Sequence, residues 1–271
     1  MQWYQYFMGG GYGDNRRHIS VLAIFKNIQK QLAFTLAEVL ITLGIIGIVA
    51  AMVIPSLISS YQKHVTVTRL KQTYAQITQA VKLSEADNGN LGGWDMAMGQ
   101  VGNYTYDSES SKKFAQTYFT PYLKYSYVCD DTKSYCSYSK KQMDNSTAIT
   151  SNFEKLYGIV LMNGVVIRFW PRVEKAAELK VDLNGSSGPN TAGKDIFSIV
   201  VSNGDLNGVL GKEKAPGVYM SGVGYSREYL MSGGTHQHYA CSKTPGRLYS
   251  GTFCGALIQL DGWKISKDYP W

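Results

Sequence analysis

The sequence predicts an α+β fold in which one long N-terminal helix packs on an antiparallel β-sheet. Three observations support this prediction: a continuous apolar run near the N-terminus, an amphipathic helical pattern directly after it, and β-rich runs joined by tight-turn residues further along. The rest of the chain has many glycines and tyrosines and few charged residues, which is typical of loop-rich exported domains. We therefore expect a basic leader at residues 1–33, a membrane-spanning helix at 34–58, an amphipathic extension at 59–88, and a loop-rich globular head at 89–271.

The leader carries much of the positive charge of this 271-residue chain. Four basic residues and one acidic residue precede Phe34 and account for +3 of the net charge of +7, so the remaining 238 residues carry only +4. These leader charges are Asp14, Arg16, Arg17, Lys26 and Lys30. Because no dense patch of Lys and Arg underlies the isoelectric point of about 9.0, nucleic acid is not expected among the partners.

Residues 34–58 contain a single charged side chain, that of Glu38, and are long enough to cross a bilayer, which takes about 20 residues. The basic leader places residues 1–33 in the cytoplasm and the chain after Ile58 outside it. A cleaved secretory signal is the alternative, because Val49 to Ala51 would suit a small-residue cleavage site. The apolar run continues past that point and contains Glu38, which favours an uncleaved span.

The amphipathic pattern follows the apolar run. Leu70, Tyr74, Ile77 and Val81 recur at steps of four, three and four, which places them on one helical face. Asn88 and Gly89 supply a stop signal. The span and its extension together predict one helix of about fifty residues, roughly 75 Å long at 1.5 Å per residue.

The β-rich part of the chain centres on a predicted hairpin. Residues 157–170 form two β-rich runs joined by Asn163-Gly164, a strong turn signal. Further strands are expected at residues 178–183 and 196–201. The connections before and after this sheet are each some seventy residues long, and we expect them to be irregular and to provide functional surface.

Four cysteines fall into two close pairs, Cys129 with Cys136 and Cys241 with Cys254. Their spacings fit neither a zinc site nor a redox motif, so we expect disulfides. Four cysteines allow three connectivities, and we favour the sequence-local one, which closes the shortest loops. A disulfide that closes a loop of about 15 residues stabilises the folded state by roughly 3 kcal/mol. Disulfides in turn indicate an oxidising compartment.

The stretch "AFTLAEVLITLGIIGIVAAMVIP" resembles the N-terminal cleavage and methylation segment of type IV pilins and of the pseudopilins of type II secretion. The resemblance implies that a prepilin peptidase cuts between Ala33 and Phe34 and methylates the new amine, which makes Glu38 the fifth residue of the mature chain. It also implies the long-helix α+β fold. Two features depart from the family pattern: Ala33 stands where glycine is most frequent, and the leader of 33 residues is longer than the short basic leaders of pseudopilins.

A carboxylate inside a membrane span costs about 2.5–3.5 kcal/mol, which calls for a reason. One interpretation is that Glu38 reaches the interface and favours the positive end of the helix dipole. The resemblance favours another, in which Glu38 pairs with the α-amine of Phe34 on a neighbouring subunit and so sets the axial register. Gly44 and Gly47 then allow close helix approach, and Pro55 weakens the helix because it cannot donate to the carbonyl of Ala51.

Two polar groups in the head are candidate metal sites. Asp182, Asn184, Asn190 and Asp195 supply hard oxygen atoms and loosely resemble the loop that binds calcium in some pseudopilins. A turn built from Asx and Gly residues is the favoured alternative. The second group, His236 and His238, lacks further ligands at a suitable spacing, so a polar loop is expected there.

No catalytic motif is recognisable, so we do not expect an enzyme. The resemblance implies a filament subunit of a type IV pilus or type II secretion pseudopilus, and the size of the head favours a minor subunit over a major one. Its partners are then the prepilin peptidase, other pilin subunits through the N-terminal helix, and the assembly platform of the inner membrane. It is located as a single-pass inner-membrane precursor and then in a periplasmic or extracellular filament. The alternative is a single-pass membrane-tethered protein whose head binds a surface ligand or DNA.

Overall fold

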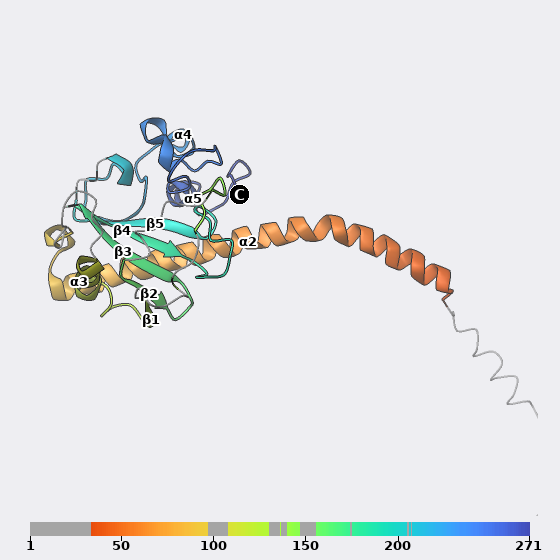
Figure 1. Cartoon of the computed structure of the whole chain (residues 1–271), viewed down its shortest axis with the longest axis horizontal. Helices are drawn as coiled ribbons and strands as arrows, with labels where there is room; N and C mark the ends of the chain where they lie inside the picture. Colours follow the sequence, from red (N-terminus) through yellow and green to blue (C-terminus); the bar gives the residue numbers. More distant parts are fainter. Residues whose placement is uncertain are drawn as a thin grey trace, which may run out of the picture. The chain divides into compact units, whose positions relative to one another are not determined.

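A computed structural model describes residues 34–96, 108–129, 136, 140–146, 156–173, 175–204, 206 and 208–271 (Figure 1). The predicted leader, residues 1–33, lies outside the described residues. The chain divides into two compact units, Met1–Leu57 and Ile58–Trp271, which we describe separately.

Helix α2 runs from Leu36 to Asn88, which confirms the prediction of one long N-terminal helix. It passes through Pro55 without a break and is followed by Gly89, whose φ of 79° is suited to a residue without a Cβ. In the first unit, nearly every side chain from Phe34 to Leu57 is exposed. In the described part of the chain, α2 is the helix that is long and apolar enough to cross a membrane.

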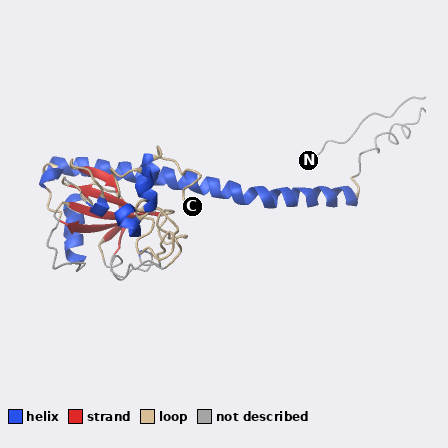
Figure 2. Ribbon diagram, turned by 90° about the horizontal axis from the view of Figure 1, so that it is seen from above, coloured by secondary structure: helices blue, strands red, loops and turns tan. Residues whose placement is uncertain are grey.

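The second unit contains a six-stranded antiparallel sheet whose strands follow one another in chain order, β1 to β6. The strands are β1 (Tyr125–Cys129), β2 (Gly158–Leu161), β3 (Val166–Val173), β4 (Ala176–Asp182), β5 (Ile196–Ser202) and β6 (Gly217–Met220). The predicted hairpin is confirmed: Gly164 turns with a φ of 84°, and the Leu161 N–H donates to Val165 O at 2.8 Å. Figure 2 shows the sheet lying alongside the later part of α2.

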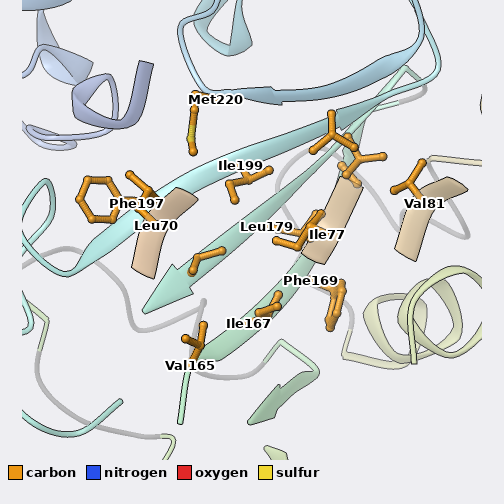
Figure 3. Packing of buried hydrophobic residues seen from close by; sticks show 14 of the residues in the cluster. Leu70, Ile77, Val81, Val165, Ile167, Phe169, Leu179, Phe197, Ile199 and Met220 are labelled. Atoms are coloured by element: carbon orange, nitrogen blue, oxygen red, sulfur yellow. The ribbon is translucent and has the colours of Figure 1, made fainter. Parts of the chain in front are cut away.

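The core lies between this later part of α2 and one face of the sheet. Leu70, Ile77 and Val81 are buried there against strand residues such as Phe169 and Leu179 (Figure 3). Truncation of one such side chain to alanine typically costs about 2–5 kcal/mol. Tyr74 lies on the same helical face but is only partly buried, and its hydroxyl donates to Val218 O at 2.6 Å. The amphipathic stripe therefore packs as predicted, and its tyrosine bonds the helix to β6.

The connection between α2 and the predicted hairpin is more regular than we expect from the sequence. It contains β1 and helix α3 (Ser108–Tyr118), so the expectation of an irregular connection is wrong for these residues. Phe114 of α3 packs into the core, and Tyr118 stacks on Trp94 with ring centroids 4.2 Å apart. The buried Ser111 hydroxyl joins α3 to the sheet, because it donates to Phe169 O and accepts from the Tyr157 N–H. A short helix fixed by such distant contacts has only a weak local signal.

The connection after β5 is also structured. It contains β6, α4 (Arg227–Ser232) and α5 (Cys254–Leu260), with short 3₁₀ turns η4 (Gly208–Leu210) and η5 (Gly234–Tyr239). Arg227 holds this region together: Nε donates to Asp261 at 2.8 Å, and the terminal nitrogens donate to Asp268 at 2.8 Å. These bonds lower the pKa of Asp268 below its usual range. The C-terminal segment is thus fixed to α4 by one guanidinium group.

The other face of the sheet carries a buried cation. Arg168 alternates with the core-facing Ile167 and Phe169 and is 2% exposed. Its guanidinium donates to Leu156 O at 2.7 Å and to Cys136 O at 2.6 Å. These bonds fasten Leu156 and Cys136 to the sheet.

Candidate functional site

The N-terminus of α2 is closed by a reciprocal set of hydrogen bonds between Thr35 and Glu38. The Thr35 N–H and hydroxyl both donate to Oε2 of Glu38, at 2.8 and 2.9 Å. In return, the Glu38 N–H donates to Oγ1 of Thr35 at 3.2 Å. This arrangement is a capping box, which satisfies backbone donors that the first helical turn leaves free. Our sequence reading missed Thr35, although the Thr-x-x-Glu spacing before an apolar run is the signal that identifies such a box.

The capping box satisfies the hydrogen bonding of Glu38 but not its charge. Residues 34–57 contain no Lys, Arg or His, so this segment offers no side-chain cation to the carboxylate. A cut before Phe34 would create an α-amine with a pKa near 7.7–8.0, and therefore a cation, four residues away in the sequence. The role of Glu38 as the acidic partner of that amine stays a prediction.

The two glycines of the span are not required by the packing of their own unit. Among the described residues, no atom lies within 4 Å of the place that a Cβ would take on Gly44 or Gly47. Small residues in spanning helices are typical of surfaces where a second helix approaches closely. The roles of Gly44, Gly47 and Pro55 in assembly stay predictions.

Both disulfides join sequence-local partners, as predicted. Cys129 pairs with Cys136 and Cys241 pairs with Cys254, with Cα atoms 5.6 and 4.7 Å apart. The first lies beside the buried Arg168 on the sheet, and the second fastens the segment after η5 to the first residue of α5. All four cysteines are therefore used as structural bridges.

The acidic loop between β4 and β5 is held by its own backbone amides. Oδ1 of Asp182 accepts from the N–H groups of Asn184 and Gly185, at 3.1 and 2.9 Å. The two carboxylate oxygens of Asp195 accept from Asn190 and Thr191, at 2.7 and 2.6 Å. These bonds are the contacts of the Asx-type turn that we favoured from the sequence.

The two carboxylates of this loop also influence each other. Both Asp182 and Asp195 are 4% exposed. Burial, together with the neighbouring charge of Asp195, raises the pKa of Asp182 to about 8. Among the described residues, no group of three or more His, Cys, Asp or Glu side chains is placed to hold a metal ion, and the calcium site stays a prediction.

The two histidines lie in an aromatic surface region around η5. Nδ1 of His236 is 2.8 Å from the hydroxyl of Tyr229, whose ring stacks on Tyr225 at 4.1 Å. The Lys212 ammonium lies 4.7 Å from the centroid of the Tyr225 ring. His238 is exposed. The structure thus places His236 in a hydrogen-bonded aromatic stack.

Two family models match the chain, one on each side of residue 55. The model described as a prokaryotic N-terminal methylation motif matches residues 28–54. The model described as a family of unknown function, DUF6613, matches residues 56–271, which is most of the chain. The chain belongs to DUF6613. No curated protein and no solved structure matches it.

The methylation motif makes this DUF6613 protein pilin-like and confirms the resemblance seen in the sequence. The matched residues include Ala33, Phe34, Glu38, Gly44 and Gly47. The DUF6613 match covers the unit Ile58–Trp271, which holds the sheet, both disulfides and the acidic loop. The N-terminal segment therefore has a recognised type, whereas the head is of unknown function.

The stability of the DUF6613 head should depend on pH through Asp182. The unfolded chain loses this proton near pH 4, whereas the folded chain keeps it up to about pH 8. Ionisation therefore favours the unfolded state, and stability falls as pH rises through this window. The Asp182→Asn variant keeps an Oδ1 acceptor for Asn184 and Gly185 but carries no charge. Its free energy of unfolding relative to the wild type should therefore increase from pH 5 to pH 8, by at most about 1.4 kcal/mol per pH unit.

Urea unfolding of both proteins across this pH range measures the effect. Asp144→Asn is the matched control, because hydrogen bonds from Ser146 lower the pKa of Asp144, and its charge does not change in this window. A stability difference between Asp182→Asn and the wild type that is constant with pH would contradict the prediction.

Proposed function

We propose that the chain is a structural, non-catalytic subunit of a type IV pilus or type II secretion pseudopilus, processed by a prepilin peptidase. The observation that carries this proposal is the methylation motif at residues 28–54, which lies at the start of a long apolar helix. Before assembly, this helix anchors the subunit in the inner membrane with its head outside the cytoplasm. After assembly, the same helix lies in the filament core.

The surface of the first unit supports assembly through helix bundling. Its large apolar side chains are exposed in the single chain, including Leu43, Ile46 and Val53. Once the subunit leaves the bilayer, this surface must be covered again, because its contact with water is unfavourable. Copies of the same kind of helix provide that cover, and the open space beside Gly44 and Gly47 permits close approach.

The unpaired charge of Glu38 gives such a bundle its register. In a dry core, a carboxylate is costly unless a cation lies beside it. The α-amine of Phe34 on the adjacent subunit supplies this cation at one axial offset. Helices stacked at another offset would leave both charges unpaired, so the pair selects a single arrangement.

The size of the head favours a minor or tip subunit. The second unit spans residues 58–271 and carries two long connections with their own helices and disulfides. In a helical shaft, each head has neighbours above and below, so every insertion must project outward. A subunit at the tip, or one present sparsely, escapes this constraint.

Processing gives the first test. The membrane-extracted protein should begin at Phe34 with a methylated α-amine, because the motif implies cleavage after Ala33. Intact-mass measurement and N-terminal sequencing read this directly. A mature chain that starts at Met52 would show an ordinary secretory signal and would exclude a pilin.

Charge and capping at Glu38 can be separated by substitution. Glu38→Gln keeps an oxygen acceptor for Thr35 but removes the charge, so the variant should insert and be cleaved yet fail to enter filaments. Loss of one partner from a buried ion pair costs about 3–5 kcal/mol, so the variant should be at least about tenfold depleted from sheared filaments. Glu109→Ala, an exposed carboxylate in α3, is the control and should be incorporated normally. Normal incorporation of Glu38→Gln would remove Glu38 from the assembly site.

The stoichiometry of purified filaments tests the minor-subunit assignment. Quantitative mass spectrometry should find this chain at a small fraction of the most abundant pilin. A ratio equal to that of the major subunit would overturn the minor role. Processed protein that is absent from filaments altogether would instead indicate a membrane-tethered binding protein.

A further inference from the structure

Lysines gather at the end of the second unit where α2 begins to contact the rest of the head. Thr66 of α2 donates through its hydroxyl to Lys194 O at 3.2 Å, which fixes the Lys194 loop beside the helix. Nζ of Lys63, one turn earlier, lies 5.9 Å from the centroid of the Trp271 ring. Nζ of Lys243 donates to Trp271 O at 2.5 Å. Two loops and one helix thus bring their lysines to the same place.

Lys141 joins this group through its backbone. Its N–H donates to Asn190 O at 2.7 Å, and its carbonyl accepts from Ala192 at 2.9 Å, so it lies beside the loop that carries Lys194. Burial and the positive charges of Lys243 and Lys141 lower the pKa of Lys194. We call this group the basic end; it consists of Lys63, Lys141, Lys194 and Lys243.

In the part of the chain that the structure describes, few carboxylates offset the basic end. Along α2 no Asp or Glu occurs between Glu38 and Glu85, whereas Arg69 and Lys71 add further positive charge. Asp195 lies near Lys194, but it is buried and both of its oxygens accept hydrogen bonds from backbone amides. Nζ of Lys243 already donates to Trp271 O, so the positive charge left for an external anion is that of Lys63, Lys141 and Lys194.

The position of the basic end along the chain identifies the kind of anion. The apolar run ends at Ile58, and Lys63 follows five residues later, roughly 8 Å along a helix. The polar headgroup layer occupies about 5–8 Å on each side of the hydrocarbon core. Basic residues are disfavoured just outside a span on this side of a membrane, so their presence here calls for a reason.

Aromatic residues accompany these lysines. The side chain of Tyr61 is 68% exposed, and Trp271 is partly exposed beside Lys63. Tyr and Trp are enriched at membrane–water interfaces because their rings have an apolar body and a polar edge. Lysines together with exposed aromatic rings, one or two turns beyond a span, form a typical interfacial surface.

We propose that the basic end lies on the anionic phospholipid surface of the membrane while the subunit awaits assembly. This inference rests on the membrane-anchored stage of the proposed function. The lysines bind lipid phosphates from the outer face, and Tyr61 and Trp271 lie among the headgroups. Extraction of the subunit into a filament must break these contacts, so lipid charge influences the availability of the subunit.

The rate of lysine acylation in lipid nanodiscs tests the proposal with the full chain. One kind of disc contains only zwitterionic phosphatidylcholine. The other kind contains phosphatidylcholine and anionic phosphatidylglycerol in a ratio of two to one. The lysines of the basic end should react roughly fivefold more slowly in the anionic discs, a factor that corresponds to about 1 kcal/mol for a lysine at a charged surface. Lys113, Lys124 and Lys214, which are exposed elsewhere on the head, should react equally in both. Salt at about 1 M should remove the protection, because it shortens screening to roughly 3 Å.

Charge reversal provides a matched pair of variants. Lys141→Glu/Lys194→Glu/Lys243→Glu leaves Lys63 as the reporter, and Lys63 should lose most of its protection. The control variant Lys113→Glu/Lys124→Glu/Lys214→Glu changes the net charge by the same amount. In this control, Lys63 should stay protected from acylation. Peptide mapping of both disulfides checks folding, and Lys→Gln versions replace the first variant if it fails that check.

Equal acylation of the basic end in both discs would overturn the proposal. Protection of these lysines from acylation that appears only in assembled filaments would also overturn the proposal. It would indicate that the basic end contacts an acidic surface of a neighbouring subunit. The discs contain no other subunit, so neither result depends on filament assembly. Failure here and failure of the filament role are therefore distinguishable.

Discussion

Helix α2 must be stable in two different surroundings, because its first part is apolar on all sides and its later part has a single apolar stripe. Much of the structure follows from this constraint. In the first part, no side chain among residues 34–57 covers the helix, and its start is closed locally by Thr35 and Glu38. In the later part, Leu70 and Ile77 are fully buried, and the sheet supplies the opposing surface. The sheet of the head thus buries the apolar stripe of the later part of α2.

Polar contacts of α2 complete this attachment. Thr66 reaches the loop between β4 and β5, Arg69 donates to Leu183 O at 3.2 Å, and Tyr74 donates to β6. Each of these bonds ends on a backbone carbonyl at the border of the sheet, where strand pairing leaves carbonyls without partners. Hydrophobic burial holds the helix on the sheet, and these bonds fix its rotation and its axial position. In the same β4–β5 connection, the buried carboxylates of Asp182 and Asp195 accept hydrogen bonds from backbone amides.

Local features of the sequence were predictable, and features that depend on distant contacts were not. The long helix, the Asn163-Gly164 hairpin and the two disulfides each depend on residues close together in the chain. By contrast, α3 forms because Ser111 and Phe114 find partners in strands that follow much later. Arg168 lies in a β-rich run, and its burial depends on Cys136, which is distant in the sequence and whose carbonyl accepts from its guanidinium. Likewise, Lys63 and Lys243 are far apart in the sequence, and only the fold brings them to the same tryptophan. In the N-terminal segment, Thr35 was within reach of sequence reasoning, because its spacing to Glu38 is a known capping pattern.

The order of the strands has a consequence for how the head folds. Within the described residues, strands that follow one another in the chain are neighbours in the sheet, so the sheet is a simple meander without crossovers. Such a sheet has short average sequence separations between paired strands, which favours rapid folding. A chain that emerges N-terminus first can add each strand to the edge left by the previous one, with α2 already present as the surface on which they collect. Each new strand covers the edge left by the previous one, which limits the time for which that edge can pair with another chain.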